Sequence, residues 1–142
     1  MCMEDNVILR IGAKILIPFI LMFALYVQFH GDYGPGGGFQ AGVIFAAAFI
    51  LYALIYGLDT AKRVIPLGFV WFCGALGVVI YAGVGVVTLV MGGEFLNYGV
   101  LDHHDASHGQ HLGILLVELG VGITVTFVMI AIFYAFAGRS RQ

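Results

Sequence analysis

The chain has 142 residues, of which 61% are hydrophobic and 10% are charged, and its mean hydropathy is +1.03. Soluble domains usually carry about 25% charged residues, and a globule of this size has too much surface to hide so many apolar side chains. The formal net charge of −2 offers no basic surface to a nucleic acid, so no nucleic-acid partner is expected. The composition excludes an ordinary soluble domain and predicts an integral membrane protein.

Four stretches of the chain contain no Asp, Glu, Lys or Arg: residues 15–31, 33–58, 64–93 and 119–138. A helix that crosses a membrane needs roughly 20 mainly apolar residues, and the backbone of a segment in lipid must be hydrogen-bonded within that segment. We therefore expect an all-α membrane protein, a single domain over residues 1–142. Its four transmembrane helices are predicted near residues 11–30, 38–57, 65–91 and 112–138.

The connection between the first two predicted spans is rich in glycine and reads HGDYGPGGGF from residue 30 to residue 39. Gly34 and Pro35 suit a tight turn, but a turn alone does not need three more glycines. Small residues recur every fourth position from Gly34 to Ala46, and this spacing lets another helix approach closely in lipid. We expect an element for helix packing and for docking of partner subunits. A bare turn and direct contact with an ion path are the alternatives. The predicted packing residues are Gly34, Pro35, Gly36, Gly37, Gly38, Phe39, Gly42 and Ala46.

The positive charges predict how the helices are oriented. Lys and Arg concentrate in cytoplasmic loops of membrane proteins. Here they precede the first span, connect the second to the third, and follow the fourth: Arg10, Lys14, Lys62, Arg63, Arg139 and Arg141. This pattern places both termini in the cytoplasm and residues 31–37 and 92–111 outside.

The loop before the fourth span is rich in histidine and aspartate, reading DHHDASHGQH from residue 102 to residue 111. His104, His108 and His111 are three or four residues apart, so on a helix they would share a broad face. Because histidine titrates near neutral pH, the loop could sense pH or pass protons. A plain polar loop that contacts partners is an alternative. A zinc site is another, but nothing in the spacing fixes a tetrahedral geometry, and no metal is predicted.

Glu118 is the only carboxylate well inside a predicted span. An ionised acid there costs about 2.5–3.5 kcal/mol on insertion scales, so it should face protein or water. It could exchange a proton or a cation, or it could pair with a Lys or Arg of a neighbouring subunit. His111 lies seven residues earlier, two turns along the same face. The candidates for an ion pathway are Glu118, His111, His108, His104, Gln40 and His30.

Two parts of the sequence resemble a known family. The string PGGGFQAG from Pro35 to Gly42, between two apolar spans, resembles the signature of the MnhB domain. That domain is the small B-type component of Mrp-type multisubunit cation/proton antiporters. The family pattern more often has two glycines where this chain has Ala41 and Gly42. The fourth span, with GQHLG leading into VELGVG, is also similar to family members, and the resemblance covers nearly the whole chain.

The resemblance implies a non-catalytic subunit of an antiporter that exchanges Na⁺ or another monovalent cation for protons. Its partners would be sister subunits in the plasma membrane of a prokaryote, and the large subunits would carry the main proton path. No enzymatic activity and no cofactor are implied. Similar domains occur in relatives of membrane-bound hydrogenases, so an accessory subunit of a redox complex is the alternative. A stand-alone channel or scaffold would leave the glycine motif unexplained.

Overall fold

The computed structural model describes residues 7–31, 34–101 and 106–139, which fold into helices and their connections. The four long helices are α1 (Val7–His30), α2 (Gly38–Tyr56), α4 (Leu67–Val90) and α5 (Ala106–Arg139). A short helix, α3 (Leu58–Val64), links α2 to α4, and a 3-10 turn, η2 (Tyr98–Leu101), precedes α5. Each long helix is long and apolar enough to cross a membrane. The prediction of an all-α membrane protein with four spans is confirmed.

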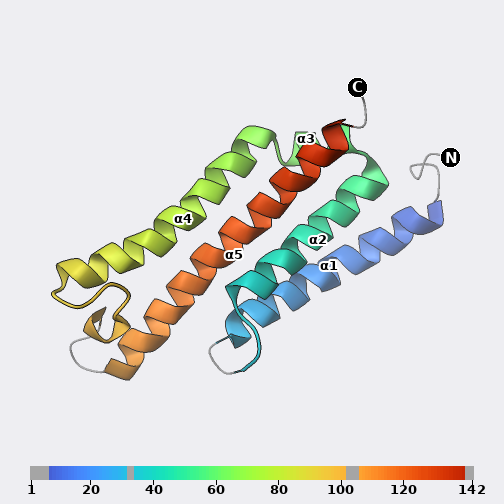
Figure 1. Ribbon diagram of the computed structural model, residues 1–142. Helices are drawn as coiled ribbons and strands as arrows, with labels where there is room; N and C mark the ends of the chain where they lie inside the picture. The colour runs from blue at the N-terminus through green and yellow to red at the C-terminus, as the bar shows by residue number, and fades with distance from the viewer. Residues whose placement is uncertain (1–6, 32–33, 102–105, 140–142) are drawn as a thin grey trace.

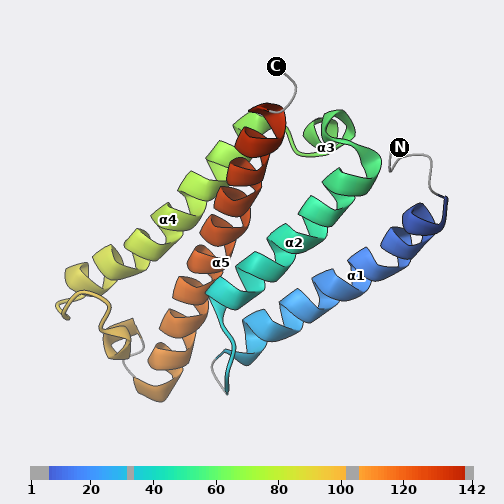
Figure 2. The same cartoon turned by 45° about the vertical axis from the view of Figure 1, so that its right-hand side comes forward.

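The helices lie side by side in the order α4, α5, α2, α1 (Figures 1 and 2). α5 packs against both α4 and α2, whereas α1 packs mainly against α2 and contacts α5 only sparsely. The start of α1, the end of α5 and α3 lie at one end of this layer, and the α1–α2 connection and η2 lie at the other (Figure 1). The positively charged residues that predicted the orientation, as far as they are described, are therefore gathered at the α3 end.

Glycine allows α5 to approach both of its neighbours closely. A methyl group at Gly42 of α2 would lie 2.7 Å from the carbonyl oxygen of Gly122, and one at Gly77 of α4 would lie 2.6 Å from that of Gly120. The Thr126 hydroxyl also donates to the Gly42 carbonyl at 3.1 Å. Small residues at these crossings allow the helix backbones to pack closely. Such packing stabilises the association of helices in lipid, to which burial of apolar surface contributes little.

The α3 end holds the main cluster of buried side chains, formed by α2, α3, α4 and α5. Its buried members are Ala46, Ala53, Leu58, Ala61, Val70, Ile130 and Tyr134. The Tyr134 hydroxyl donates to the Ile65 carbonyl at 3.0 Å, and the Lys62 ammonium lies 5.8 Å from the centre of the Tyr134 ring. These contacts fix the turn between α3 and α4 against the last turns of α5.

α5 begins six residues before the predicted start of the fourth span, because the segment after α4 supports its first turns. The Tyr98 ring of η2 packs on Gly113, where an added methyl group would overlap it. The pKa of the Tyr98 hydroxyl is raised mainly by burial and to a lesser extent by the neighbouring Tyr81, so this hydroxyl stays protonated. The backbone N–H of Leu96 donates to the Thr88 hydroxyl at 3.0 Å, which ties this segment to α4. At about 1.5 Å per residue, the 34 residues of α5 span roughly 51 Å, more than the apolar core of a bilayer.

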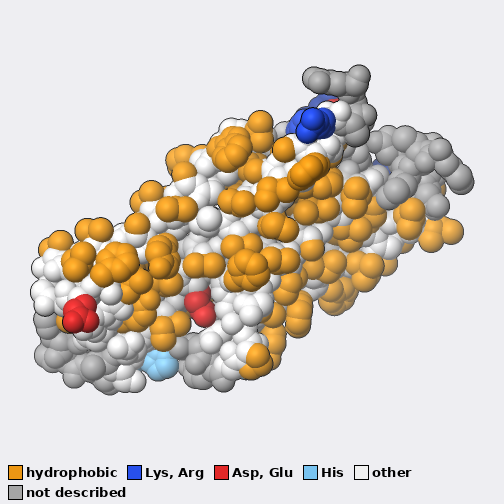
Figure 3. All heavy atoms as spheres, in the orientation of Figure 1, with side chains coloured by type: hydrophobic (Ala, Val, Ile, Leu, Met, Phe, Trp, Pro, Cys, Tyr) orange, Lys and Arg blue, Asp and Glu red, His pale blue; other side chains and the backbone are white. Residues whose placement is uncertain are grey.

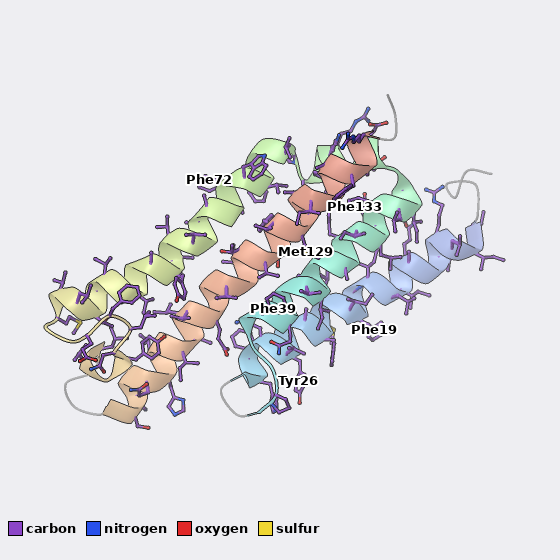
Figure 4. The ribbon with its side chains drawn as sticks, viewed as in Figure 1. Phe19, Tyr26, Phe39, Phe72, Met129 and Phe133 are labelled. Carbon is purple, nitrogen blue, oxygen red and sulfur yellow. The ribbon has the colours of Figure 1, made fainter. Side chains whose placement is uncertain are left out.

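The face of the molecule drawn in Figure 3 is apolar along most of the length of the helices. Phe19 of α1 and Phe72 of α4 point away from the layer (Figure 4) and are 63% and 65% exposed. The buried residues of α1 are only Ala13, Ala24 and Gln28. Apolar faces of this extent need lipid or other membrane helices around them.

Candidate functional site

The Glu118 carboxylate of α5 lies against the glycines of the α1–α2 connection. A methyl group at Gly31 would lie 2.5 Å from Oε2 and 2.6 Å from Oε1, and one at Gly37 would lie 2.9 Å from Oε1. Gly37 has a φ of 132°, which L residues with a side chain rarely adopt. The carboxylate therefore lies directly against the backbone of the α1–α2 connection. It occupies space that any side chain at Gly31 or Gly37 would fill.

The neighbouring glycines of the run each face a backbone group. A methyl group at Gly36 would lie 2.9 Å from the Val27 carbonyl oxygen of α1, and one at Gly38 would overlap the Glu118 carbonyl oxygen. The Gly37 N–H also donates to the Val27 carbonyl at 3.3 Å. The three consecutive glycines thus bring the start of α2 close to both α1 and α5, and this requirement explains why a simple turn would not suffice.

A cavity of about 360 Å³ separates the end of α1 from the first turns of α5. Gln28 and Phe29 of α1 line it, with His108, His111, Leu112, Leu115 and Glu118 of α5. The α5 residues recur at intervals of three or four and so share one helix face. The structure brings together three of the six predicted ion-pathway residues: Glu118, His111 and His108.

The other predicted ion-pathway residues have different surroundings. The His30 ring stacks on Tyr26, with 5.2 Å between the ring centres, and is not part of the cavity lining. Gln40 is exposed, and its Oε1 lies 3.6 Å from the position of a methyl group on Gly37, the same glycine that Glu118 contacts. His104 lies outside the described residues, as do Asp102, His103 and Asp105.

The predicted packing residues differ in their surroundings. Gly34 and Gly36 are half-buried against α1, and Gly37 is buried beside Glu118. Gly38, Gly42 and Ala46 are buried within the chain, and the first two face α5. Pro35 is exposed, and Phe39 is exposed and points away from α2 (Figure 4). The glycine row therefore packs helices of this chain, while docking of another subunit on this region stays a prediction.

Gln28 was missed by reasoning from the sequence. It is 5% exposed, and among the described residues its Nε2 atom has no hydrogen-bond partner. Its Oε1 lies 2.7 Å from the position of a methyl group on Gly122, one turn beyond Glu118 on α5. The available signal was a primary amide inside an apolar span, because polar residues within membrane helices usually face the protein interior.

The part of the chain that the structure describes contains no group of three His, Cys, Asp or Glu side chains placed to hold a metal ion. The chemistry of the cavity lies in its carboxylate, its amide and its two imidazoles. Carboxylate and imidazole groups exchange protons, and carboxylate and amide oxygens also bind monovalent cations. The fold and the cavity define a multi-pass membrane protein in which a half-buried carboxylate and two exposed imidazoles line a pocket between α1 and α5.

Comparison with known proteins identifies the family. The family model described as "Domain related to MnhB subunit of Na+/H+ antiporter" matches residues 8–131, so this chain belongs to the MnhB family. The resemblance seen in the glycine motif is thereby confirmed.

Relatives in bacteria match over most of their own length. The putative antiporter subunit mnhB2 of Staphylococcus haemolyticus is 35% identical over 137 residues, covering 95% of this chain and 96% of the relative. The putative antiporter subunit mnhB2 of Staphylococcus aureus strain Newman is 30% identical with the same coverage. The B-type subunit of the Na(+)/H(+) antiporter of Bacillus subtilis is 29% identical over 130 residues, covering 85% of this chain and 90% of the relative.

Proposed function

We propose that this chain is a membrane subunit of a multisubunit Na⁺/H⁺ antiporter and contributes Glu118 to its ion pathway. The observation that supports the ion-pathway role is the Glu118 carboxylate in the cavity between α1 and α5, together with two histidines of the same helix face. An ionised acid is costly in a membrane, and its place beside such a cavity favours a role in ion exchange over a purely structural one.

The cavity provides a route for protons along α5. His108 lies nearest the start of the helix, His111 follows, and Glu118 lies seven residues further, a rise of about 10.5 Å. Direct transfer over that distance is not feasible, so water must connect the imidazoles to the carboxylate. Histidine accepts and releases protons near neutral pH, and a carboxylate can hold either a proton or a monovalent cation. Alternating occupancy of Glu118 by these two ions is the elementary step of exchange.

The chain performs this step only together with partner subunits. Its long helices carry Lys or Arg only near the ends at the α3 side of the layer, namely Arg10 and Lys14 of α1 and Arg139 of α5. Its single inner carboxylate cannot by itself form a path across the membrane. The apolar faces of α1 and α4 suit contact with other membrane helices or with lipid. The names of the relatives are those of antiporter subunits, which favours an antiporter over a redox complex. As a transporter subunit it carries no enzymatic activity, and the plasma membrane of a bacterium is its expected location.

Deletion of this chain from its host tests the proposed function. Everted membrane vesicles from the deletion strain should show no proton movement on addition of Na⁺, and a plasmid copy of the chain should restore it. The measurement is the recovery of a pH-dependent dye signal, with vesicles containing the chain alone as the control. Normal exchange in the deletion strain, or exchange by the chain alone, would contradict its role as a required but insufficient subunit.

The orientation is tested with reporters at the two ends of the layer. We expect both termini in the cytoplasm because the Lys and Arg residues flank that end. A fluorescent protein fused after Gln142 should therefore fold and emit, while cysteines placed at residues 93 and 99 should react with an impermeant maleimide in intact cells. Reporter activity from an alkaline phosphatase fused after Gln142 would reverse the proposed orientation.

A further inference from the structure

Gln28 contributes an amide to the cavity, and the ion pathway proposed above assigns no role to this polar group. Gln28 lies two residues from the end of α1 and lines the same cavity as Glu118. It is 95% removed from solvent, and its Nε2 has no hydrogen-bond partner among the described residues. A buried donor without an acceptor is costly, so a residue of this kind needs a partner that the described side chains do not supply.

The surroundings of Gln28 indicate what this partner is. The cavity walls between its polar ends are apolar, formed by Phe29, Leu112 and Leu115. Its volume of about 360 Å³ has room for several water molecules, each of which needs two to four polar partners. Gln28 and Glu118 supply these partners at the inner end, and His108 and His111 supply them nearer the start of α5. The amide oxygen and nitrogen can exchange places by a half-turn of the side chain, so either can face the cavity.

We propose that Gln28 holds a water molecule at the inner end of this cavity and so keeps Glu118 in contact with the aqueous phase. The amide N–H donates to the water oxygen, and the water donates to the Glu118 carboxylate. This inference rests on the proposed role of Glu118. Without the amide, the inner end of the cavity would be lined by apolar side chains and the carboxylate alone, and water would be held there less well. Gln28 is therefore a positioning residue that acts through water.

Chemical labelling measures this aqueous contact directly. The assembled complex in vesicles is treated with a water-soluble carbodiimide and methylamine, and conversion of Glu118 to its amide is quantified by mass spectrometry. We expect Glu118 to be labelled in the wild-type complex and to be labelled several-fold more slowly in Gln28→Leu, which has a similar volume but no amide. Gln28→Asn keeps the amide and should restore part of the labelling rate.

Gln110→Leu is the matched control. It makes the same change on the exposed side of α5, one residue from His111, but Gln110 does not line the cavity. Its labelling rate should equal that of the wild type. No labelling of Glu118 in the wild-type complex, or equal rates in wild type and Gln28→Leu, would overturn the proposal.

Antiport provides a second readout. Gln28→Leu should slow Na⁺-dependent proton exchange by about tenfold, the effect of one lost hydrogen bond, while the amount of assembled complex stays unchanged. Exchange at the wild-type rate in Gln28→Leu, in a complex that Glu118→Gln inactivates, would refute the role of Gln28 alone. Full exchange in Glu118→Gln would instead refute the proposed ion pathway, and the labelling result would still report whether Gln28 hydrates the cavity.

Discussion

Replacing Glu118 with glutamine is expected to abolish Na⁺-dependent proton exchange while the antiporter complex still assembles. Glutamine keeps the size of the side chain and its hydrogen-bonding capacity, so the packing against Gly31 and Gly37 is retained. It cannot titrate, however, and loss of a positioned proton-transfer group typically slows a reaction by about 100-fold or more. Glu118→Asp keeps the acid on a shorter side chain and should retain partial activity.

The measurement is exchange in vesicles across a range of pH, normalised to the amount of assembled complex. A purely structural role for Glu118 predicts a different pattern. If its carboxylate only neutralised a cation of a neighbouring subunit, glutamine would leave that charge buried and unpaired. Such a loss typically costs about 3–5 kcal/mol, and assembly itself would fail. Wild-type exchange by a fully assembled Glu118→Gln complex would remove this residue from the mechanism.

Replacing Gly38 with alanine is expected to be the most damaging of the small substitutions for stability. The added methyl group would overlap the carbonyl oxygen of Glu118, and a backbone group cannot rotate away as a flexible side chain can. α2 and α5 would have to separate, and overpacking of this kind costs about 1–3 kcal/mol. The same shift would move Glu118 relative to the glycine connection, so exchange should fall together with stability.

Matched controls come from glycines that face open space. Gly12 of α1 and Gly83 of α4 have nothing within 4 Å of an added methyl group. Because alanine favours a helix over glycine by up to about 1 kcal/mol, Gly12→Ala and Gly83→Ala should be neutral or stabilising. The comparison uses the amount of chain in the membrane and the melting temperature of the purified complex. An unchanged melting temperature for Gly38→Ala would show that the α2–α5 contact is looser than the structure has it.

The fold was largely predictable because the distribution of charge carries most of the information about a membrane protein. The gaps between charged residues located all four spans, and glycine spacing indicated close helix crossings. The early start of α5 was not predicted, since its first turns depend on Tyr98 packing on Gly113, a tertiary contact that the local sequence does not reveal. The helix α3 was missed for a similar reason, because its seven residues join a core formed by three other helices.

The candidate site was predicted in part. Regular spacing along one helix was enough to relate His108, His111 and Glu118, because all three depend only on the geometry of α5. Gln28 belongs to another helix, and no spacing rule connects it to Glu118. The glycine row shows the same limit: its period predicted a close helix neighbour, but only the structure shows that this neighbour is α5 of the same chain.

The central place of α5 has a consequence for biosynthesis. α5 is the last of the four helices to leave the ribosome, yet α4 and α2 pack mainly through it. Until α5 is inserted, the α1–α2 pair and α4 therefore lie in the membrane without packing against each other. The layer of four helices forms only when α5 inserts between them. A nascent chain halted before residue 106 would expose the apolar and glycine surfaces of α2 and α4 to other proteins. Quality-control proteases recognise such exposed surfaces. Premature termination should therefore lead to degradation of the chain rather than to a partly active product.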